Sequence, residues 1–473
     1  MCVRIAKATP FAGKPIITMP SVYGVTTGKE AMYRIPVLGQ RPVKLLVTDL
    51  PTGLVFENGF IKGIVPADGE FTITVTAENA LGRDEKQVKL SSYPDNALRT
   101  PLLGFTTWNA FIWNLNQQLV EDIARFMRDS GIAEYGYNYI NLDSGWQKEY
   151  GGEFYAVIPE EDKFPDMKGF CDTMHEMGFK CGVYSSPMSW ALGSPMTKKI
   201  PGATQGERDI RFCARRDGVG KEHYEGNNVR QWEAWGFDYL KYDWSPTDTY
   251  LADLMKQELL KAKRDISFCV TVQADPGYYM YWQKNCCSFR CNKDSLQEWK
   301  NIKDRLKTTE PWENYIIPGH FYDLDMLEIG VINKELFREK LSNEEELFSY
   351  TMRAFFLSPI QLSSALEKLT EFEMDMVCNE EIIALNQDAL CDFPRKFCEY
   401  PGREAVVYHR KLENGDRAIC VFNSDDIPFA EEVALGETFQ IRDLWEKKDL
   451  GIGDSVKLNV EPHCVRVLRL SKI

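Results

Sequence analysis

The sequence has little of what several large classes of protein require. Its five histidines are scattered, none of them four residues from another, and its thirteen cysteines form no repeated Cys-x-x-Cys pair. These patterns give only weak support to a zinc site, and no P-loop or Gly-x-Gly-x-x-Gly motif is present to hold a nucleotide. We therefore expect no metal ion and no organic cofactor.

Long apolar runs and a basic excess are missing as well. The longest apolar stretch, around residues 353–362, is far below the ~20 residues that a membrane span requires. Lys and Arg number 56 against 70 Asp and Glu, which gives a net charge of -14, whereas binding to phosphates needs a basic surface. We expect neither a membrane nor a nucleic acid as a partner.

The cellular compartment is predicted from the N-terminus and the cysteines. Residues 1–7 lack the apolar segment of a signal peptide. A chain of this length does not need disulfides, so irregularly spaced cysteines indicate free buried thiols in a reducing compartment. We expect a cytoplasmic protein, or a secreted one if a signal peptide has been removed. The sequence leaves homo-oligomerisation open.

The composition is that of a globular protein, with 44% hydrophobic and 12% aromatic residues, and 473 residues predict two or three domains. Residues 1–95 contain short β-rich runs, including 43–48 and 71–76, separated by turn residues. In the second run Phe71, Ile73 and Val75 alternate onto one face together with Ala77. This spacing predicts a small β-sandwich.

Residues 98–392 alternate between two kinds of segment. Strand-like runs occupy 137–143, 178–184, 237–243 and 267–272, and helix-like runs occupy 117–130, 166–177, 226–235 and 250–263. This rhythm predicts an α/β fold in which about eight units form a (β/α)8 TIM barrel. In residues 393–473 the runs 405–410 and 417–422, joined through Asn414-Gly415, predict an antiparallel β-sandwich domain.

Polar and aromatic side chains follow the predicted barrel strands, where the active-site mouth of such a barrel lies. Carboxylates accept hydrogen bonds from sugar hydroxyls, and aromatic rings stack on sugar C–H surfaces, so this set is typical of a carbohydrate site. Its members are Trp108, Asp143, Ser144, Tyr184, Lys241, Asp243, Arg290, Asp294, Asp323 and Asp325.

Lys241 and Asp243 are the most informative pair, because alternate residues of a strand face the same way. A cation beside a partly buried carboxylate keeps it ionised, and an ionised Asp can act as a nucleophile in glycoside hydrolysis. The alternative is an ion pair that only stabilises the strand end. Asp294 is the candidate acid/base if burial or a neighbouring carboxylate raises its pKa, and otherwise a helix N-cap.

The remaining candidates also have structural alternatives. Asp143 can bind substrate hydroxyls or can serve as a turn residue, and Trp108 and Tyr184 can contact a sugar or pack in the core.

Several segments together resemble glycoside hydrolase family 27, the α-galactosidase and α-N-acetylgalactosaminidase family. They are 100–111, with Gly104-Phe105-Thr106-Thr107-Trp108-Asn109, followed by 139–147, 237–243, 323–327, 385–388 and 442–445. The resemblance covers roughly residues 98–473. Residues 1–95 are an addition to the minimal family pattern, and they resemble the immunoglobulin-like modules of some bacterial members.

The resemblance implies a retaining mechanism and a role for each matching residue. Asp243 matches the nucleophile, and Asp294, which keeps the family spacing from Arg290 and Trp299, matches the acid/base. The carboxyl groups of such a pair lie about 5–5.5 Å apart. The matching substrate-binding residues are Trp108, Asp143, Tyr184, Lys241 and Arg290, with Ser144 beside them.

Two departures bear on the substrate. Asp143-Ser144-Gly145-Trp146 stands where the family usually has Asp-Asp-Cys-Trp, so an acceptor for the O4/O6 edge of galactose is missing. Residues 273–275 lack the usual Cys-Glu-Trp at the end of the fifth strand. We expect an exo-acting α-galactosidase. The alternatives are the same mechanism on a β-L-arabinopyranoside, an α-N-acetylgalactosaminide or an α-glucoside such as an isomalto-oligosaccharide, or a glycan-binding protein without activity.

Overall fold

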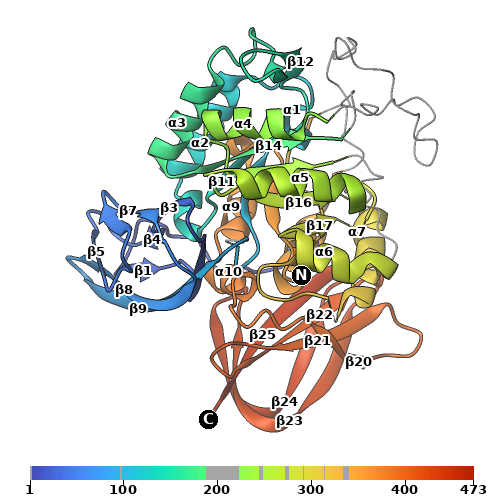
Figure 1. The fold of residues 1–473 in the computed structure, drawn as a ribbon. Coiled ribbons are helices and arrows are strands. Elements are labelled where there is room, and N and C mark those ends of the chain that lie inside the picture. Colours follow the sequence, from blue (N-terminus) through green and yellow to red (C-terminus); the bar gives the residue numbers. More distant parts are fainter. Residues whose placement is uncertain are drawn as a thin grey trace.

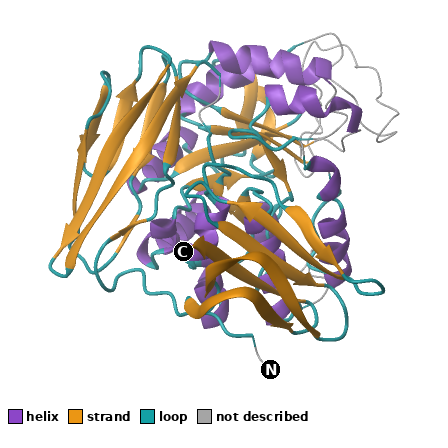
Figure 2. Ribbon diagram, turned by 90° about the horizontal axis from the view of Figure 1, so that it is seen from below, coloured by secondary structure: helices purple, strands orange, loops and turns teal. Residues whose placement is uncertain are grey.

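The structure is a computed structural model that describes residues 3–95, 98–187, 223–243, 249–271, 276–290, 292–313, 315–333 and 340–473. The described chain forms an N-terminal region of strands, a central barrel with helices around it, and a C-terminal sheet (Figure 1). Figure 2 shows the first and last as separate regions of strand, each beside helices of the barrel. Within the described residues no helix is long and apolar enough to cross a membrane.

The N-terminal region is a β-sandwich with one apolar core. One sheet has the order β2 (Val22–Thr26), β9 (Gly82–Tyr93), β8 (Gly69–Asn79), β5 (Lys44–Thr48), and the other β3 (Glu30–Arg34), β7 (Phe60–Ile64), β6 (Leu54–Glu57). Two short strands, β1 (Ile16–Ile17) and β4 (Val37–Leu38), pair beside them. Ile73, Val75 and Ala77 are completely buried and Phe71 packs against the same core, which confirms the predicted face.

The barrel consists of eight parallel strands, as the sequence predicted. Their order is β18 (Phe321–Asp323), β17 (Ser288–Arg290), β16 (Ser267–Thr271), β15 (Tyr239–Tyr242), β14 (Lys180–Ser185), β11 (Tyr139–Leu142), β10 (Leu103–Thr106), β19 (Ile360–Leu362). Leu327, just after β18, donates its N–H to Gln361 of β19 at 2.9 Å and so connects the two ends of the sheet. The strands are buried almost throughout, as expected for a parallel sheet covered by helices.

Several helices begin where the sequence supplies a cap. Asn116 accepts the N–H of Leu119 at the start of α2 (Gln117–Asp129), and Asp166 caps α3 (Met167–Met177) in the same way. Ser342 forms a capping box with Glu345 at α8 (Asn343–Phe355). The other helices are α1 (Trp108–Phe111), α4 (Glu225–Trp235), α5 (Thr249–Lys261), α6 (Tyr279–Asn285), α7 (Trp299–Lys307), α9 (Glu371–Val377) and α10 (Glu380–Asn386). Short helical turns cover Ile132–Tyr135, Pro276–Tyr278, Glu310–Trp312 and Leu366–Lys368, and a hairpin pairs β12 (Gln147–Gly151) with β13 (Ala156–Pro159).

The C-terminal region is an antiparallel sheet, again as predicted. Its order is β20 (Arg395–Glu399), β21 (Ala405–Lys411), β22 (Arg417–Asn423), β25 (Cys464–Lys472), β23 (Phe429–Asp443), β24 (Lys448–Val460). Gly415, with φ 88°, makes the predicted turn between β21 and β22. The fully buried Arg410 of β21 donates to the carbonyl of Phe355 at 3.1 Å, which fixes the sheet to α8.

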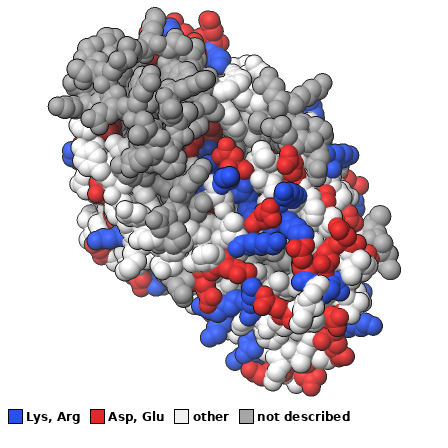
Figure 3. Space-filling model, turned by 90° about the vertical axis from the view of Figure 1, so that its right-hand side faces the viewer, with Lys and Arg blue, Asp and Glu red and all other residues white. Residues whose placement is uncertain are grey.

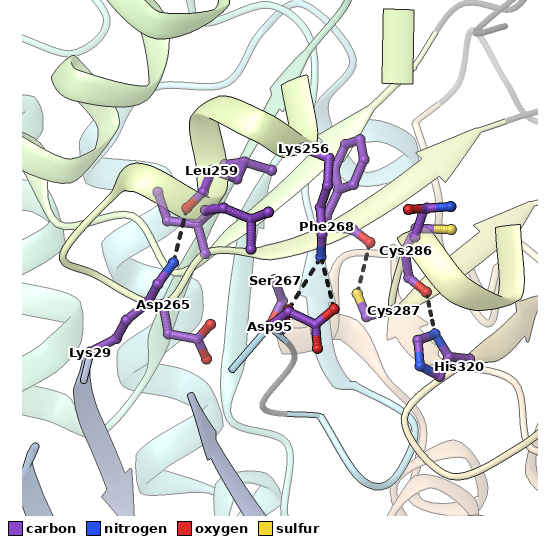
Figure 4. A pocket seen from close by; sticks show the side chains of 13 residues that line it. Lys29, Asp95, Lys256, Leu259, Asp265, Ser267, Phe268, Cys286, Cys287 and His320 are labelled. Carbon is purple, nitrogen blue, oxygen red and sulfur yellow. Dashed lines mark hydrogen bonds and ion pairs between the residues drawn. The ribbon is translucent and has the colours of Figure 1, made fainter. Parts of the chain in front are cut away.

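The N-terminal sandwich packs on the end of the barrel where the strands begin. Glu134, just before β11, accepts hydrogen bonds from Arg34 at 2.9 Å and from the N–H of Val37 at 3.0 Å. Lys29 of the sandwich donates to the carbonyl of Leu259 at 2.9 Å, beside a cavity of about 20 Å³ at the start of β16 and just before β17 (Figure 4). The cavity has room for about one water molecule.

Charged side chains on the surface are mixed in sign. On the described part of the face in Figure 3, Lys and Arg are interspersed with Asp and Glu. Ion pairs such as Lys396–Glu310 at 2.8 Å and Arg395–Glu313 at 2.9 Å join β20 to residues 310–313. Exposed pairs of this kind contribute little to stability and are typical of a solvated surface.

Candidate active site

The register of the parallel strands brings the predicted site residues to one end of the barrel. Tyr184 of β14 lies opposite Lys241 of β15, and Arg290 of β17 lies opposite Asp323 of β18. Asp143 and Asp243 directly follow β11 and β15. All of them are therefore at the carboxyl ends of the strands, where TIM-barrel enzymes have their active sites.

Lys241 of β15 is paired with Asp143, which follows β11, the next strand but one in the sheet. The ammonium donates to Asp143 Oδ2 at 2.7 Å, and the two side chains are only 15% and 4% exposed. Burial lowers the pKa of Lys241, but the carboxylates of Asp143 and Asp243 outweigh it and raise the pKa above its usual value. Burial raises the pKa of Asp143, and the hydrogen bond from Lys241 opposes this shift.

The alternation along the strand predicts that Lys241 and Asp243 face the same way, whereas the hydrogen bond of Lys241 goes to Asp143. Asp243 still acts on Lys241 through its charge. Its backbone N–H donates to the carbonyl of Ser185 at 2.9 Å, which continues the pairing of β14 and β15 to the candidate nucleophile. Lys241 also lies 5.9 Å from the centre of the Tyr184 ring, so Tyr184 forms a wall beside the ammonium.

Arg290 joins two carboxylates of the site. It donates to Asp294 Oδ1 at 2.7 Å and contacts Asp325 Oδ1 at 3.0 Å. Burial of Asp325 favours its neutral form, but the guanidinium of Arg290 prevails and holds the pKa of that carboxyl well below its usual range. Arg290 and Asp325 thus form a buried ion pair, and Asp294 is bonded to the guanidinium of that pair.

The expectation that burial acts on Asp294 is wrong, since its side chain is 81% exposed. The alternative of a helix N-cap is also wrong for α7, which begins at Trp299 after Glu298. The side chain of Asp294 is therefore held by its ion pair with Arg290, and its carboxyl is exposed to solvent. A carboxyl in this position is accessible to substrate and to water.

The segment after β11 is held in a fixed conformation. The N–H of Asp143 donates to Thr107 Oγ1 at 2.9 Å, and the N–H of Ser144 donates to Asp143 Oδ1 at 2.7 Å. Asp143 thus uses one oxygen for Ser144 and the other for Lys241, and Ser144 is buried. Trp108 begins α1 and packs edge-on against Trp113 with ring centroids 5.1 Å apart, which leaves it half-buried at the same end.

Two site residues were missed from the sequence. Arg353 of α8, completely buried, donates to the carbonyls of Leu324 and Met326 at 3.3 and 2.6 Å and so fixes the segment that carries Asp325. Glu328 is buried behind the loop of Asp294. Arg353 lies in the longest apolar stretch of the sequence, residues 353–362, and nothing local to the sequence connects it with a strand end.

A second group of polar side chains lies at the other end of the barrel. His175, Cys181 and Asp238 are close enough for their side-chain atoms to share an ion. Arg264, however, donates to Asp238 at 2.7 Å and lies 3.1 Å from His175, so a guanidinium already supplies the positive charge there. This group is an ion-pair network.

The predicted fifth-strand residues 273–275 lie outside the described residues.

Comparison with known proteins decides the family. A model described as "Alpha galactosidase A" matches residues 100–388, and one described as "Alpha galactosidase C-terminal beta sandwich domain" matches residues 402–470. The chain belongs to glycoside hydrolase family 27. As a family 27 protein it is a glycoside hydrolase, and its substrate is a carbohydrate.

Individual family 27 relatives agree with this assignment. An α-galactosidase of Oryza sativa subsp. japonica is 25% identical over 407 residues, which cover 82% of this chain and 89% of the relative. A structure proposed as an α-galactosidase/melibiase of Bacteroides fragilis NCTC 9343 superimposes with a TM-score of 0.87 at 26% identity and covers 98% of this chain and 99% of its own. The likeness to that structure therefore includes the N-terminal sandwich.

A family 27 β-L-arabinopyranosidase of Geobacillus stearothermophilus shares the fold, with a TM-score of 0.69 at 19% identity, over 79% of this chain and 98% of its own.

Proposed function

We propose that the protein is a retaining, exo-acting α-galactosidase with Asp243 as nucleophile and Asp294 as acid/base. The observation that carries the proposal is the convergence of Lys241, Arg290 and the two catalytic candidates at one end of the barrel, within one network of charges. The relatives named above as α-galactosidases support galactose as the sugar.

The reaction follows from the two carboxyl groups. Asp243 attacks the anomeric carbon while the glycosidic bond breaks and protonated Asp294 gives its proton to the leaving oxygen. In the second step Asp294, now ionised, takes a proton from water, which attacks the same carbon and releases Asp243. The released sugar keeps the anomeric configuration of the substrate, because two inversions cancel.

The two cations of the site lie within the electrostatic reach of Asp243. Its charge acts on both Lys241 and Arg290. Asp143, fixed by Lys241, presents a carboxylate to sugar hydroxyls, and the half-buried ring of Trp108 offers a face for stacking. Exposed Asp294 can reach both the leaving group and water.

Ser144 favours a second candidate, the hydrolysis of β-L-arabinopyranosides. This sugar shares the ring configuration of galactose but lacks the C6 hydroxymethyl group, so it has no need of a carboxylate at position 144. Ser144 is buried against Asp143 and adds no second charge there.

The test is a panel of nitrophenyl glycosides, with α-galactoside, β-L-arabinopyranoside, α-N-acetylgalactosaminide and α-glucoside. We expect turnover of the α-galactoside, with the α-anomer detected first by NMR. Asp243→Ala should abolish this turnover, while Asp416→Asn, a carboxylate change in the C-terminal sheet, should not. Sugar binding without turnover of any glycoside would identify a glycan-binding protein, and full activity of Asp243→Ala would rule out the nucleophile.

A further inference from the structure

A buried carboxylate, Glu328, connects two segments of the site. It lies five residues after β18 and is only 4% exposed. One oxygen accepts a hydrogen bond from Asn109 Nδ2 at 2.8 Å, and the other accepts one from Ser295 Oγ at 2.8 Å. Its two oxygens therefore bridge the first strand end of the barrel and the loop after β17.

Both partners are sequence neighbours of candidate site residues. Asn109 directly follows Trp108, and Ser295 directly follows Asp294. Consecutive Cα atoms are about 3.8 Å apart, so each tether acts one peptide unit from its target. A shift of Glu328 would therefore move Trp108 and Asp294 relative to each other.

Several hydrogen bonds together fix the orientation of Ser295. Its N–H donates to Asp325 Oδ2 at 2.7 Å, and its hydroxyl also receives a hydrogen bond from Arg353 at 3.2 Å. A hydroxyl has a single proton, so with Arg353 as donor it gives that proton to Glu328. Glu328 and Arg353 thus fix the hydroxyl from two sides, and the arrangement needs a carboxylate or amide oxygen at position 328.

Asp294 needs such a support more than a buried residue would. Its side chain is 81% exposed, so its direction depends on the ion pair with Arg290 and on the backbone that carries it, not on packing. The backbone at the next residue is the part that Asp325 and Glu328 hold.

We propose that Glu328 is a positioning residue for the acid/base, acting through Ser295, and that it sets the spacing between Asp294 and Trp108 through Asn109. The proposal rests on the proposed function of Asp294. Burial raises the pKa of the Glu328 carboxyl, while Arg353 opposes the shift.

The expected signature is a dependence on the leaving group. A poor leaving group such as methanol needs the proton of Asp294, whereas dinitrophenolate leaves without it. Glu328→Ala should lower kcat/KM about 10- to 100-fold for the methyl glycoside and less than about 3-fold for the dinitrophenyl glycoside, since general acid catalysis and its alignment carry factors of this size. Glu328→Gln, which keeps one oxygen and the side-chain shape, should restore most of the loss.

The experiment measures kcat/KM for both glycosides in the wild type, Glu328→Ala, Glu328→Gln, Ser295→Ala and Asp294→Ala, with the sugar that the wild type cleaves. Glu134→Gln is the matched control, a buried carboxyl change at the other end of the barrel. We expect Asp294→Ala to lose much more kcat/KM on the methyl glycoside than on the dinitrophenyl glycoside, a difference that we call the split. Glu328→Ala and Ser295→Ala should show a smaller split, and the control should show none.

Equal losses on the two glycosides in Ser295→Ala and in any Glu328 variant that folds would overturn the proposal and leave the function intact. Should Glu328→Ala fail to fold, Ser295→Ala and Glu328→Gln decide. A wild type without glycosidase activity, or an Asp294→Ala variant without a split, would instead refute the proposed function of Asp294.

Discussion

Replacing Lys241 by Met should make the stability of the barrel depend strongly on pH. The substitution keeps a side chain of similar length but removes the ammonium that donates to Asp143 at 2.7 Å. The Asp143 carboxyl, 4% exposed, then stays buried without its cation. An unpaired buried carboxyl binds a proton more tightly than an exposed one, so its pKa in the folded protein rises.

The size of the effect follows from linkage. With the folded pKa above the unfolded value of about 3.9, the folded state holds a proton that the unfolded state has released, so stability falls as pH rises. Each pH unit costs about 1.4 kcal/mol until the folded pKa is reached. If that pKa exceeds 7, the loss is about 1.5 kcal/mol at pH 5 and about 4 kcal/mol at pH 7.

Thermal unfolding at pH 5 and pH 7 checks this difference of roughly 3 kcal/mol, which corresponds to about 6 °C in Tm for a domain of this size. The double variant Lys241→Met with Asp143→Asn removes the buried charge and should recover most of the loss at pH 7. A deficit in Lys241→Met that is equal at the two pH values and is not recovered by Asp143→Asn would refute the reasoning.

Three further outcomes are expected. Burial opposes protonation of His175, but Asp238 raises its pKa to about 9. The ion pair of protonated His175 therefore stabilises the folded protein fully below about pH 6.5, and this stabilisation is lost as pH rises through about 9. His175→Gln should flatten the fall in Tm between these pH values, and an unchanged slope would contradict it. Glu134→Ala removes the acceptor of Arg34 and should expose the N-terminal sandwich to limited proteolysis with kcat/KM unchanged; a variant as resistant as the wild type would contradict the docking role. Ser144→Asp should raise the ratio of kcat/KM for α-galactoside over β-L-arabinopyranoside by about 10-fold or more, the value of one charged hydrogen bond, and a constant ratio would remove position 144 as a determinant of the sugar.

The sequence predicted the parts of the fold that depend on neighbours in the chain. The run 237–243 became β15, Tyr239–Tyr242, and the helix predicted at 117–130 is α2, Gln117–Asp129. Apolar alternation, caps such as Asn116 and the Asn414-Gly415 turn are local signals, and the elements they predict appear within a few residues of the expected bounds.

What the sequence could not predict depends on register between distant segments. Lys241 pairs with a carboxylate 98 residues away instead of the one two residues along. Arg353, in an apolar stretch of helix, binds a loop that begins 29 residues earlier, at Leu324. Strand-end position identified the candidates, but only the closed sheet determines their partners.

The most direct test of the account is to trap the covalent intermediate. The protein is incubated with an activated fluorinated galactosyl donor, whose glycosyl-enzyme hydrolyses slowly, and its peptides are examined by mass spectrometry. We predict one galactosyl adduct, on Asp243, with activity lost in proportion to labelling. An adduct on another carboxylate, or continued turnover of the donor with inversion of the anomeric carbon, would contradict the mechanism.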